Sequence, residues 1–226
     1  VSGLTTTGAS IVTNVEALSK SILFWRSFSH WIGGMGVIVF VMAITARAPD
    51  RSMHILRAEM PGPIVDKLVP RSKDTAKILY LIYMALTVVI VIALLLCGMP
   101  LFDSLVHAFG TAGTGGFGIK ADGVASYSPA AQWVLTIGMF IFSINFNLYY
   151  LILIGKFKTA IKSTELRVFT GIVLISTAVI TFNIIDIFSS FSDALRNAAF
   201  QVSSIVSTTG FSTCDFDKWN SVAKTT

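Results

Sequence analysis

Long apolar stretches separated by short polar segments make up most of this chain. Four of the stretches are long enough to cross a bilayer, which takes about 20 consecutive apolar residues in a helix. They cover residues 25–46, 78–101, 133–154 and 168–188. The pattern therefore predicts an all-α integral membrane protein in which these four segments span the lipid bilayer.

Two further segments have a helical pattern but are too short and too polar to span. Residues 103–113 follow the second apolar stretch, and residues 192–206 follow the fourth. We expect Asp103 and either Ser192 or Asp193 to cap these helices, because their side chains accept hydrogen bonds from first-turn N–H groups. Each half-helix runs into a cluster of Gly, Thr and Ser. The order of span, half-helix, polar loop and span predicts a re-entrant pore-loop unit, M1–P–M2.

The polar cluster occurs three times, and each copy is centred on a glycine: Gly8, Gly116 and Gly210. When the copies are aligned on this glycine, threonine lies two places before it in all three. The aligned sets are Thr5, Thr6, Thr7 and Gly8 in loop 1; Gly113, Thr114, Gly115 and Gly116 in loop 2; and Ser207, Thr208, Thr209 and Gly210 in loop 3. A single cluster would be an ordinary turn, but three in the same register predict one element built by repetition.

These loops have the composition of a selectivity filter for a monovalent cation. Backbone carbonyls can replace the hydration shell of an ion without adding fixed charge. Glycine reaches, without steric cost, the backbone angles that point successive carbonyls at one axis. Irregular backbone at membrane depth is tolerated only where it is buried in protein or lines a watery cavity. We therefore predict that loops 1, 2 and 3 line one ion path.

The distribution of charge predicts the sidedness of the chain. Only 13% of residues are charged, about half the usual share in soluble domains. Basic residues outnumber acidic ones in two loops, seven to four in residues 47–77 and four to one in residues 156–167. By the positive-inside rule both loops are cytoplasmic, and the filter loops face outward from a cell (inner) membrane. The net charge of +5 therefore needs no nucleic-acid partner to explain it.

The repeat divides the chain into five parts. Residues 1–46 form the end of repeat 1 (filter loop and M2), 47–72 a cytoplasmic loop, 73–155 the whole of repeat 2, 156–167 a second cytoplasmic loop, and 168–226 the start of repeat 3. Because repeat 1 lacks its leading span and repeat 3 its closing span, the sequence is predicted to be a fragment.

Several glycines and polar residues in or near the predicted spans allow two interpretations each. The glycines at 33, 34 and 36 are either a hinge near the pore or sites of close helix packing, and we expect packing, since small residues let helices approach closely. We expect His30 to be a hydrogen-bonded packing residue and not a proton relay. His107 and Gln201 align nine places before their glycines, and we expect His107 to form a structural hydrogen bond to the filter backbone and not to contact the ion. Asn145 and Asn147 either bond between helices or face an inner vestibule, and Asp215 and Asp217 either attract cations or lie in a surface loop. No arrangement typical of an enzyme is found in the sequence.

The string Val1-Ser-Gly-Leu-Thr-Thr-Thr-Gly-Ala-Ser10 resembles the first filter of the Trk/Ktr/HKT potassium transporter superfamily, most closely the bacterial TrkH type. Further matching strings, in order, are Trp25-Arg26, Trp31-Ile-Gly-Gly-Met-Gly36, Arg57-Ala-Glu59, Gly62-Pro63, Asp66-Lys67-Leu68, Pro70-Arg71, Gly98-Met-Pro-Leu-Phe-Asp103 and Phe200-Gln-Val202. The resemblance covers essentially the whole chain.

This resemblance implies four M1–P–M2 repeats around one pseudo-fourfold potassium pore, with the three glycines as filter glycines. It also implies a homodimer in the lipid bilayer and a cytoplasmic nucleotide-binding regulatory subunit (TrkA-like). It implies no cofactor, and K⁺ is the transported ion. The sequence departs from the family by stopping before the fourth filter and the gate, so the fragment is not expected to conduct alone. An ion-coupled secondary transporter with a broken-helix site at the midplane is the alternative.

Overall fold

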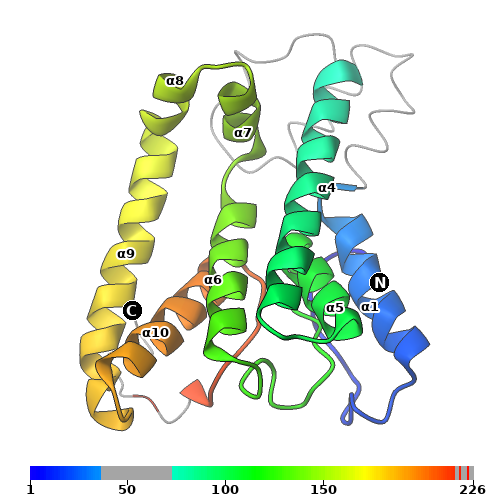
Figure 1. Cartoon of the computed structure of the whole chain (residues 1–226), viewed down its shortest axis with the longest axis vertical. Helices are drawn as coiled ribbons and strands as arrows, with labels where there is room; N and C mark the ends of the chain where they lie inside the picture. The colour runs from blue at the N-terminus through cyan, green and yellow to red at the C-terminus, as the bar shows by residue number, and fades with distance from the viewer. Residues whose placement is uncertain (37–72, 217–218, 220–222, 224–226) are drawn as a thin grey trace.

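The computed structural model describes residues 1–36, 73–216, 219 and 223, and their regular structure is helical, as the apolar pattern predicts. The elements are α1 (Lys20–Trp31), the π-helical turn η1 (Ile32–Gly36), α4 (Lys73–Leu96), α5 (Leu101–Ala112), α6 (Pro129–Ser143), α7 (Phe146–Leu153), α8 (Phe157–Ile161), α9 (Thr164–Ile184), the 3₁₀ turn η2 (Ile185–Ile187) and α10 (Phe191–Val206). The helices α4, α6 and α9 run along the long axis, and the shorter α5 and α10 lie toward one end of it (Figure 1).

Two helices are long and apolar enough to cross a membrane by themselves. They are residues Lys77–Leu96 of α4, and Thr164–Ile187, which joins α9 and η2. The first residues of α9 fall within the predicted cytoplasmic loop 156–167, which also contains α8. Of the first predicted span, the structure describes α1 and η1, and residues 37–46 lie outside the described part of the chain.

The third predicted span, residues 133–154, is bent in its middle. It consists of α6 and α7, which meet at an angle of 87°. The break has a local cause, because Ile144 adopts extended backbone and Asn145 caps the new helix. The Asn145 side chain accepts a hydrogen bond from the Asn147 N–H (3.0 Å) and donates to the Glu165 carboxylate (3.4 Å), which connects it to α9. Of the two readings for Asn145, the bond between helices is the one observed.

The predicted N-caps of both half-helices are wrong by a few residues. The second span ends at Leu96, and α5 begins directly after Pro100, whose fixed φ is suited to a helix start. Asp103 therefore lies in the first turn, where its carboxylate accepts from the Tyr127 hydroxyl (2.8 Å). In α10 the cap is Ser190, whose hydroxyl accepts from the Asp193 N–H (3.2 Å) and bonds the Asp193 carboxylate (2.8 Å).

The half-helices are the best-buried parts of the fold. Helix α5 packs against α1, α4 and α6, and α10 packs against α6 and α9. The core between them is formed by large apolar side chains: Tyr83, Leu94, Leu135, Met139, Phe200 and Phe211. By contrast, α4 and α9 expose apolar side chains such as Val89 and Phe182 on their outer faces. This inside-out distribution is the one expected of helices that face lipid or further helices.

Candidate ion-selectivity filter

Loops 2 and 3 form the C-terminal caps of the two half-helices. In loop 2 the Thr114 N–H donates to the Thr111 carbonyl (3.2 Å), and the Gly115 N–H donates to the Gly110 carbonyl (3.0 Å). Loop 3 repeats both bonds, with the Thr208 and Thr209 N–H groups donating to carbonyls three and five residues upstream, each at 2.9 Å. This pair of bonds defines a Schellman motif, in which a left-handed residue ends the helix.

Loop 1 has the same hydrogen-bond pattern, although little chain precedes it. The Thr6 N–H donates to the Gly3 carbonyl (3.2 Å) and the Thr7 N–H to the Ser2 carbonyl (3.1 Å). The Thr5 N–H also donates to the Val1 carbonyl (3.0 Å), so the first residues form a helical turn. Loops 1, 2 and 3 are thus equivalent in backbone structure, in the register that the glycine alignment predicts.

The backbone angles repeat as closely as the hydrogen bonds. The aligned glycines have positive φ, at 72°, 70° and 86° for Gly8, Gly116 and Gly210. The threonine two places before each glycine also has positive φ, at 53°, 49° and 58° in loops 1, 2 and 3. Left-handed backbone is rare for a β-branched residue and costs about 1–2 kcal/mol. Such strain, repeated at one position in three loops, is typical of a functional site.

The strained threonines are the feature that sequence reasoning missed. Glycine is the usual residue at the helix-ending position, and threonine was expected only to supply a carbonyl or a hydroxyl. The available signal was the Thr-x-Gly spacing, which recurs in all three loops while the middle residue varies.

The three loops lie next to one another in chain order. A Cβ atom added to Gly8 would overlap the carbonyl oxygen of Gly115, and one added to Gly116 would overlap the carbonyl oxygen of Thr209. Loop 1 therefore contacts loop 2, and loop 2 contacts loop 3, through backbone atoms that only glycine allows to come so close. This arrangement brings backbone carbonyl groups of loops 2 and 3 close to the glycines of loops 1 and 2.

In loops 2 and 3, accessible and buried residues alternate. Thr114 and Gly116 are partly accessible, and Gly113 and Gly115 between them are buried. In loop 3 the corresponding pair Thr208 and Gly210 is exposed, while Ser207 and Thr209 are buried. Loop 1 differs, because Thr5 and Thr7 are exposed there. The left-handed positions are thus the ones that reach open space in loops 2 and 3.

Replacing Thr114 with glycine is expected to raise the stability of the protein and lower its transport activity. Glycine adopts positive φ freely, so the substitution should add about 1 kcal/mol to the free energy of unfolding. The measurement is the midpoint of thermal unfolding in detergent, taken together with rubidium uptake by cells. Thr111→Gly, in the last turn of α5 at ordinary helical angles, is the control and should lower the midpoint. An unchanged midpoint in Thr114→Gly would mean that the threonine is not strained.

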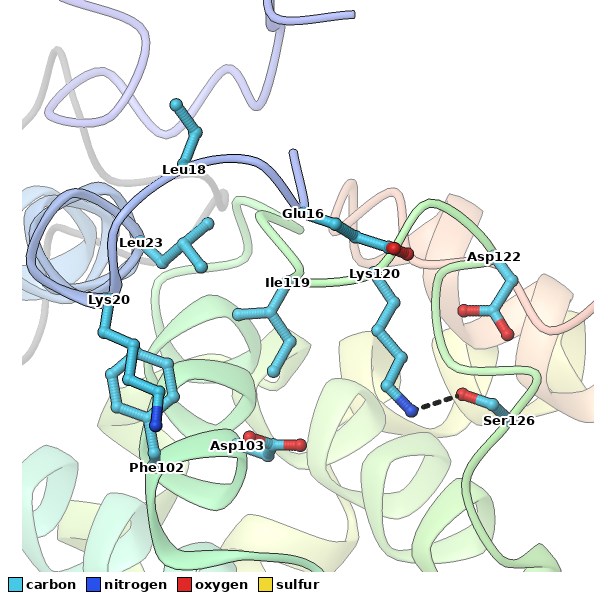
Figure 2. A pocket seen from close by; sticks show the side chains of 10 residues that line it. All are labelled: Glu16, Leu18, Lys20, Leu23, Phe102, Asp103, Ile119, Lys120, Asp122 and Ser126. Atoms are coloured by element: carbon cyan, nitrogen blue, oxygen red, sulfur yellow. Dashed lines mark hydrogen bonds between the residues drawn. The ribbon is translucent and has the colours of Figure 1, made fainter. Parts of the chain in front are cut away.

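A cavity of about 580 Å³ lies between the start of α1, the first turn of α5 and the segment that follows loop 2 (Figure 2). Its lining is charged but mixed: Glu16, Asp103 and Asp122 carry carboxylates, and Lys20 and Lys120 carry ammonium groups. The carboxylates of Glu16 and Asp103 are already used as acceptors, by the Ala121 N–H (3.1 Å) and the Tyr127 hydroxyl (2.8 Å). The lining is therefore of mixed charge, with three carboxylates and two ammonium groups, and two of the carboxylates are held by hydrogen bonds.

The Tyr127 hydroxyl, which donates to the lining residue Asp103, remains protonated. Burial, followed by its bond to Asp103, raises the pKa of the Tyr127 phenol above its ordinary value. The ammonium group of Lys120 lies over the Tyr127 ring (4.4 Å) and donates to Ser126 (2.8 Å). Across the described parts of the chain, His, Cys, Asp and Glu side chains form no group of three or more that could hold a metal ion.

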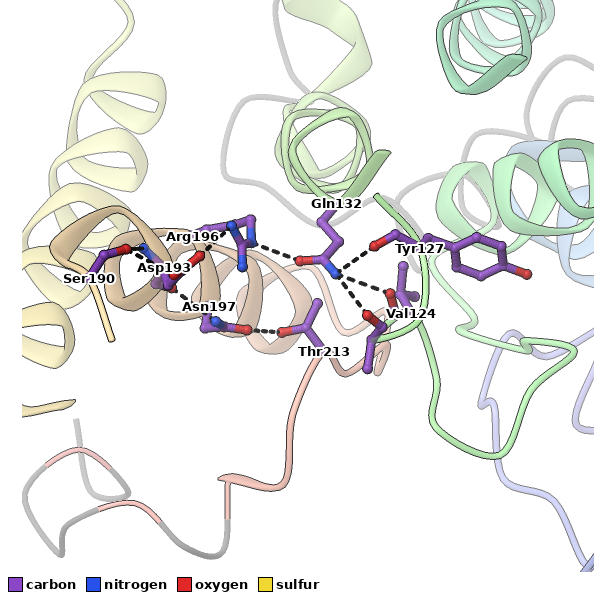
Figure 3. A network of polar contacts seen from close by, with 9 residues as sticks. Val124, Tyr127, Gln132, Ser190, Asp193, Arg196, Asn197 and Thr213 are labelled. Atoms are coloured by element: carbon purple, nitrogen blue, oxygen red, sulfur yellow. Dashed lines mark hydrogen bonds and ion pairs between the residues drawn. The ribbon is translucent and has the colours of Figure 1, made fainter. Parts of the chain in front are cut away.

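A polar network, buried at Gln132 and reaching the surface at Ser190, joins α6 to α10 beside loop 3 (Figure 3). The Gln132 side chain donates to the carbonyls of Val124, Ala125 and Tyr127 (3.3, 3.3 and 3.2 Å) and accepts from Arg196 (2.9 Å). Arg196 also pairs with Asp193 at 2.8 Å. The Ser190 hydrogen bond, and then Arg196, lower the pKa of the Asp193 carboxyl, so it stays ionised. The network fixes α10 to the start of α6 and to the segment that follows loop 2.

Most of the other predicted residues have packing roles. Gly33 and Gly34 allow close contact, since a Cβ on Gly33 would overlap the Leu4 carbonyl and one on Gly34 would lie 2.9 Å from the Tyr83 hydroxyl. Gly36 makes only ordinary contacts. His107 is buried and bonds the Asp103 carbonyl of its own helix (2.8 Å), and not the filter backbone. Asp217 lies outside the described residues.

Half-helices that pack against apolar spans and end in adjacent, strained loops define a pore-loop membrane protein. A family model described as TrkH, cation transport protein, matches residues 1–226. The chain therefore belongs to the TrkH family of cation transport proteins.

Similar proteins are potassium transporters by name. The Trk system potassium uptake protein TrkH of Salmonella typhimurium is 40% identical over 225 residues, covering 96% of this chain and 46% of that protein. The protein TrkG of Escherichia coli is 33% identical, with 97% and 46% covered. The crystal structure of the potassium transporter TrkH from Vibrio parahaemolyticus matches with a TM-score of 0.81 at 33% identity, over 97% of this chain and 45% of that one. The chain thus spans about half the length of these relatives.

Proposed function

We propose that this chain supplies three filter loops of a potassium uptake protein. The observation that carries the proposal is the threefold repetition of one strained loop, with the same bonds and the same signs of φ around Gly8, Gly116 and Gly210. Membership of a cation transport family supports it, as do relatives that are named potassium uptake proteins.

In this proposal, K⁺ is the transported ion and the carbonyl groups of loops 1, 2 and 3 are its ligands. These loops comprise residues 5–8, 113–116 and 207–210. Carbonyl ligands suit a monovalent cation, because binding is then strong enough for entry and weak enough for exit. The half-helices α5 and α10 end at loops 2 and 3, so their C-terminal partial negative charge adds to the attraction for a cation.

We further propose an inner-membrane location, with the filter loops outward and residues 47–77 and 156–167 cytoplasmic. The division into the end of repeat 1, the whole of repeat 2 and the start of repeat 3 belongs to the same proposal. So do a homodimer and a TrkA-like nucleotide-binding regulatory subunit docked on the basic loops. The basic residues of the second loop support the orientation, because Lys158 and Lys162 lie in and beside α8, at the end of α9 remote from loop 3 (Figure 1).

The competing function is ion-coupled secondary transport. The observation in its favour is the 87° break between α6 and α7, because broken helices form the midplane sites of such transporters. Against it, the Asn145 side chain at the break already accepts from the Asn147 N–H as a helix cap and donates to the Glu165 carboxylate, so both its polar atoms are used within the protein. A dependence of potassium uptake on a gradient of protons or sodium would favour this alternative.

The test uses the complete gene in a bacterial strain that lacks potassium uptake. We expect the gene to restore growth at low potassium and to support rubidium uptake that potassium inhibits more strongly than sodium does. Gly210→Ser should remove the growth at low potassium, because it places a side chain at φ +86° in loop 3. Gly155→Ser is the matched control, at φ +78° in the turn after α7, and should retain it. Normal potassium-limited growth of the Gly210 variant would refute the filter assignment.

A further inference from the structure

Loops 1 and 3 are held in shape by their own side chains. In both, the serine six places before the glycine bonds the carbonyl that follows the glycine: Ser2 to Ala9 (2.7 Å) and Ser204 to Phe211 (2.6 Å). A second pair of hydroxyls bonds across the strained threonine, Thr5 with Thr7 (2.8 Å) and Ser207 with Thr209 (2.6 Å). The two loops are therefore braced in the same way, at the same positions.

Loop 2 lacks every one of these braces. The three positions that carry hydroxyls in the other loops are Gly110, Gly113 and Gly115. The loop nevertheless has the same backbone bonds and the same signs of φ as loops 1 and 3. Loop 2 must therefore be held in shape by residues outside the loop, and α1 makes the contacts that could do so.

Helix α1 occupies the space beside Gly113 and Gly115, while the Phe211 ring, directly after loop 3, lies beside Gly110. The Ser27 hydroxyl donates to the Phe117 carbonyl (3.2 Å). Phe117 directly follows the glycine of loop 2, so this carbonyl is equivalent to the ones that Ser2 and Ser204 bond in loops 1 and 3. A Cβ on Gly115 would fall within the His30 ring, and one on Gly113 would overlap the His30 carbonyl oxygen. Both Ser27 and His30 are buried, with 1% and 0% of their surfaces exposed.

The same face of α1 also holds the residue that follows the filter glycine. The His30 ring lies 4.0 Å from the Phe117 ring, and the Arg26 guanidinium lies over that ring at 4.3 Å. Arg26 in addition donates to the Ser10 hydroxyl (3.1 Å), just after loop 1. Three residues of one helix face thus fix loop 2 relative to loop 1.

We propose that Ser27 and His30 are positioning residues that hold loop 2 from outside, in place of the hydroxyl braces of loops 1 and 3. The inference rests on the proposed function, since it takes loop 2 to be part of the ion path. It makes ion selection by this loop depend on α1, so a displacement of α1 would change loop 2 while loops 1 and 3 keep their internal braces.

The first test compares two glycines that meet different parts of the same histidine. In the complete gene, Gly115→Ala should lower rubidium uptake at least about tenfold, the effect of 1.4 kcal/mol. Combining it with His30→Ala should raise uptake to the level of His30→Ala alone, because the ring that the new Cβ meets is gone. Gly113→Ala should be equally harmful but not restored by His30→Ala, since its Cβ meets the main-chain oxygen. Restoration of both variants, or of neither, would overturn the proposal.

The second test asks whether α1 sets selectivity and not merely folding. Ser27→Ala removes one hydroxyl, and we expect the preference for potassium over sodium in competition with rubidium uptake to fall about tenfold, at an unchanged level of protein in the membrane. Ser27→Thr keeps the hydroxyl and should retain the preference. Ser29→Ala is the control, because this buried hydroxyl bonds only the Arg26 carbonyl of its own helix (2.6 Å).

The outcomes separate the two proposals. If Gly210→Ser removes rubidium uptake while Ser27→Ala leaves the potassium preference unchanged, the filter assignment stands and the brace is refuted. If Gly210→Ser leaves uptake and selectivity as they are, the filter assignment itself fails.

Discussion

Substituting alanine for Gly116 is expected to reduce rubidium uptake by the complete protein at least about 30-fold. Two costs act together at this position. The new Cβ would overlap the Thr209 carbonyl oxygen of loop 3, and overpacking costs about 1–3 kcal/mol. The residue also has φ +70°, which for a residue with a side chain costs about 1–2 kcal/mol. Their sum, about 2–5 kcal/mol, corresponds to a change of roughly 30-fold to several thousandfold.

The control separates crowding between loops from backbone strain. Gly98, in the turn between α4 and α5, has φ +83° with no atom near the position of a Cβ. Gly98→Ala therefore carries the backbone cost alone and should leave uptake within a few-fold of the original. The two variants are compared by initial rates of rubidium uptake, normalised to protein in the membrane. Equal rates in both variants would show that loops 2 and 3 are not in contact at Gly116.

Replacing Gln132 with leucine is expected to lower the free energy of unfolding by about 2–4 kcal/mol, because buried partners lose their hydrogen bonds. The Gln132 amide serves the carbonyls of three residues after loop 2 and also accepts from Arg196. Leucine fills a similar volume but offers neither donor nor acceptor. We expect repeats 2 and 3 to loosen first at this junction, beside loop 3. The measurement is the midpoint of thermal unfolding of the purified complete protein in detergent.

Thr136→Val is the matched control for this substitution. Thr136 lies one turn further along α6 and is as buried as Gln132, each with 5% of its surface exposed. Its hydroxyl bonds only the Gln132 carbonyl of its own helix (2.8 Å). Its replacement should therefore move the midpoint much less. A Gln132→Leu midpoint equal to that of Thr136→Val would contradict a structural role for the network.

The shared backbone structure of loops 1, 2 and 3 was predictable because its signal is local. Glycine at 8, 116 and 210, with threonine two places before, is a pattern that can be read without knowing any contact. The half-helices before loops 2 and 3 were equally visible from their length and polarity. Their starting residues were not, because capping depends on small differences in local geometry: Pro100 and Ser190 precede the helices that Asp103 and Ser192 or Asp193 were expected to begin.

The break between α6 and α7 was missed for a related reason. Residues 133–154 are uniformly apolar apart from a few polar side chains, and hydropathy alone does not reveal a bend of 87°. The side chain that starts the second helix, Asn145, was noticed as polar, but its partner Glu165 lies 20 residues further along the chain. A hydrogen bond between distant segments is decided by packing and leaves no local pattern.

By itself, the sequence determined that the chain is helical, built for a membrane and repetitive, since these properties follow from apolar length and from the spacing of small polar residues. Only the tertiary structure decided how each loop is held. Loop 2 has glycine at 113 and 115, and His30 fills the space beside these two residues, while Ser27 bonds the Phe117 carbonyl that follows the loop. The physical reason is that close packing lets a side chain from one repeat replace a missing side chain in another, and such an exchange is visible only where the two repeats meet.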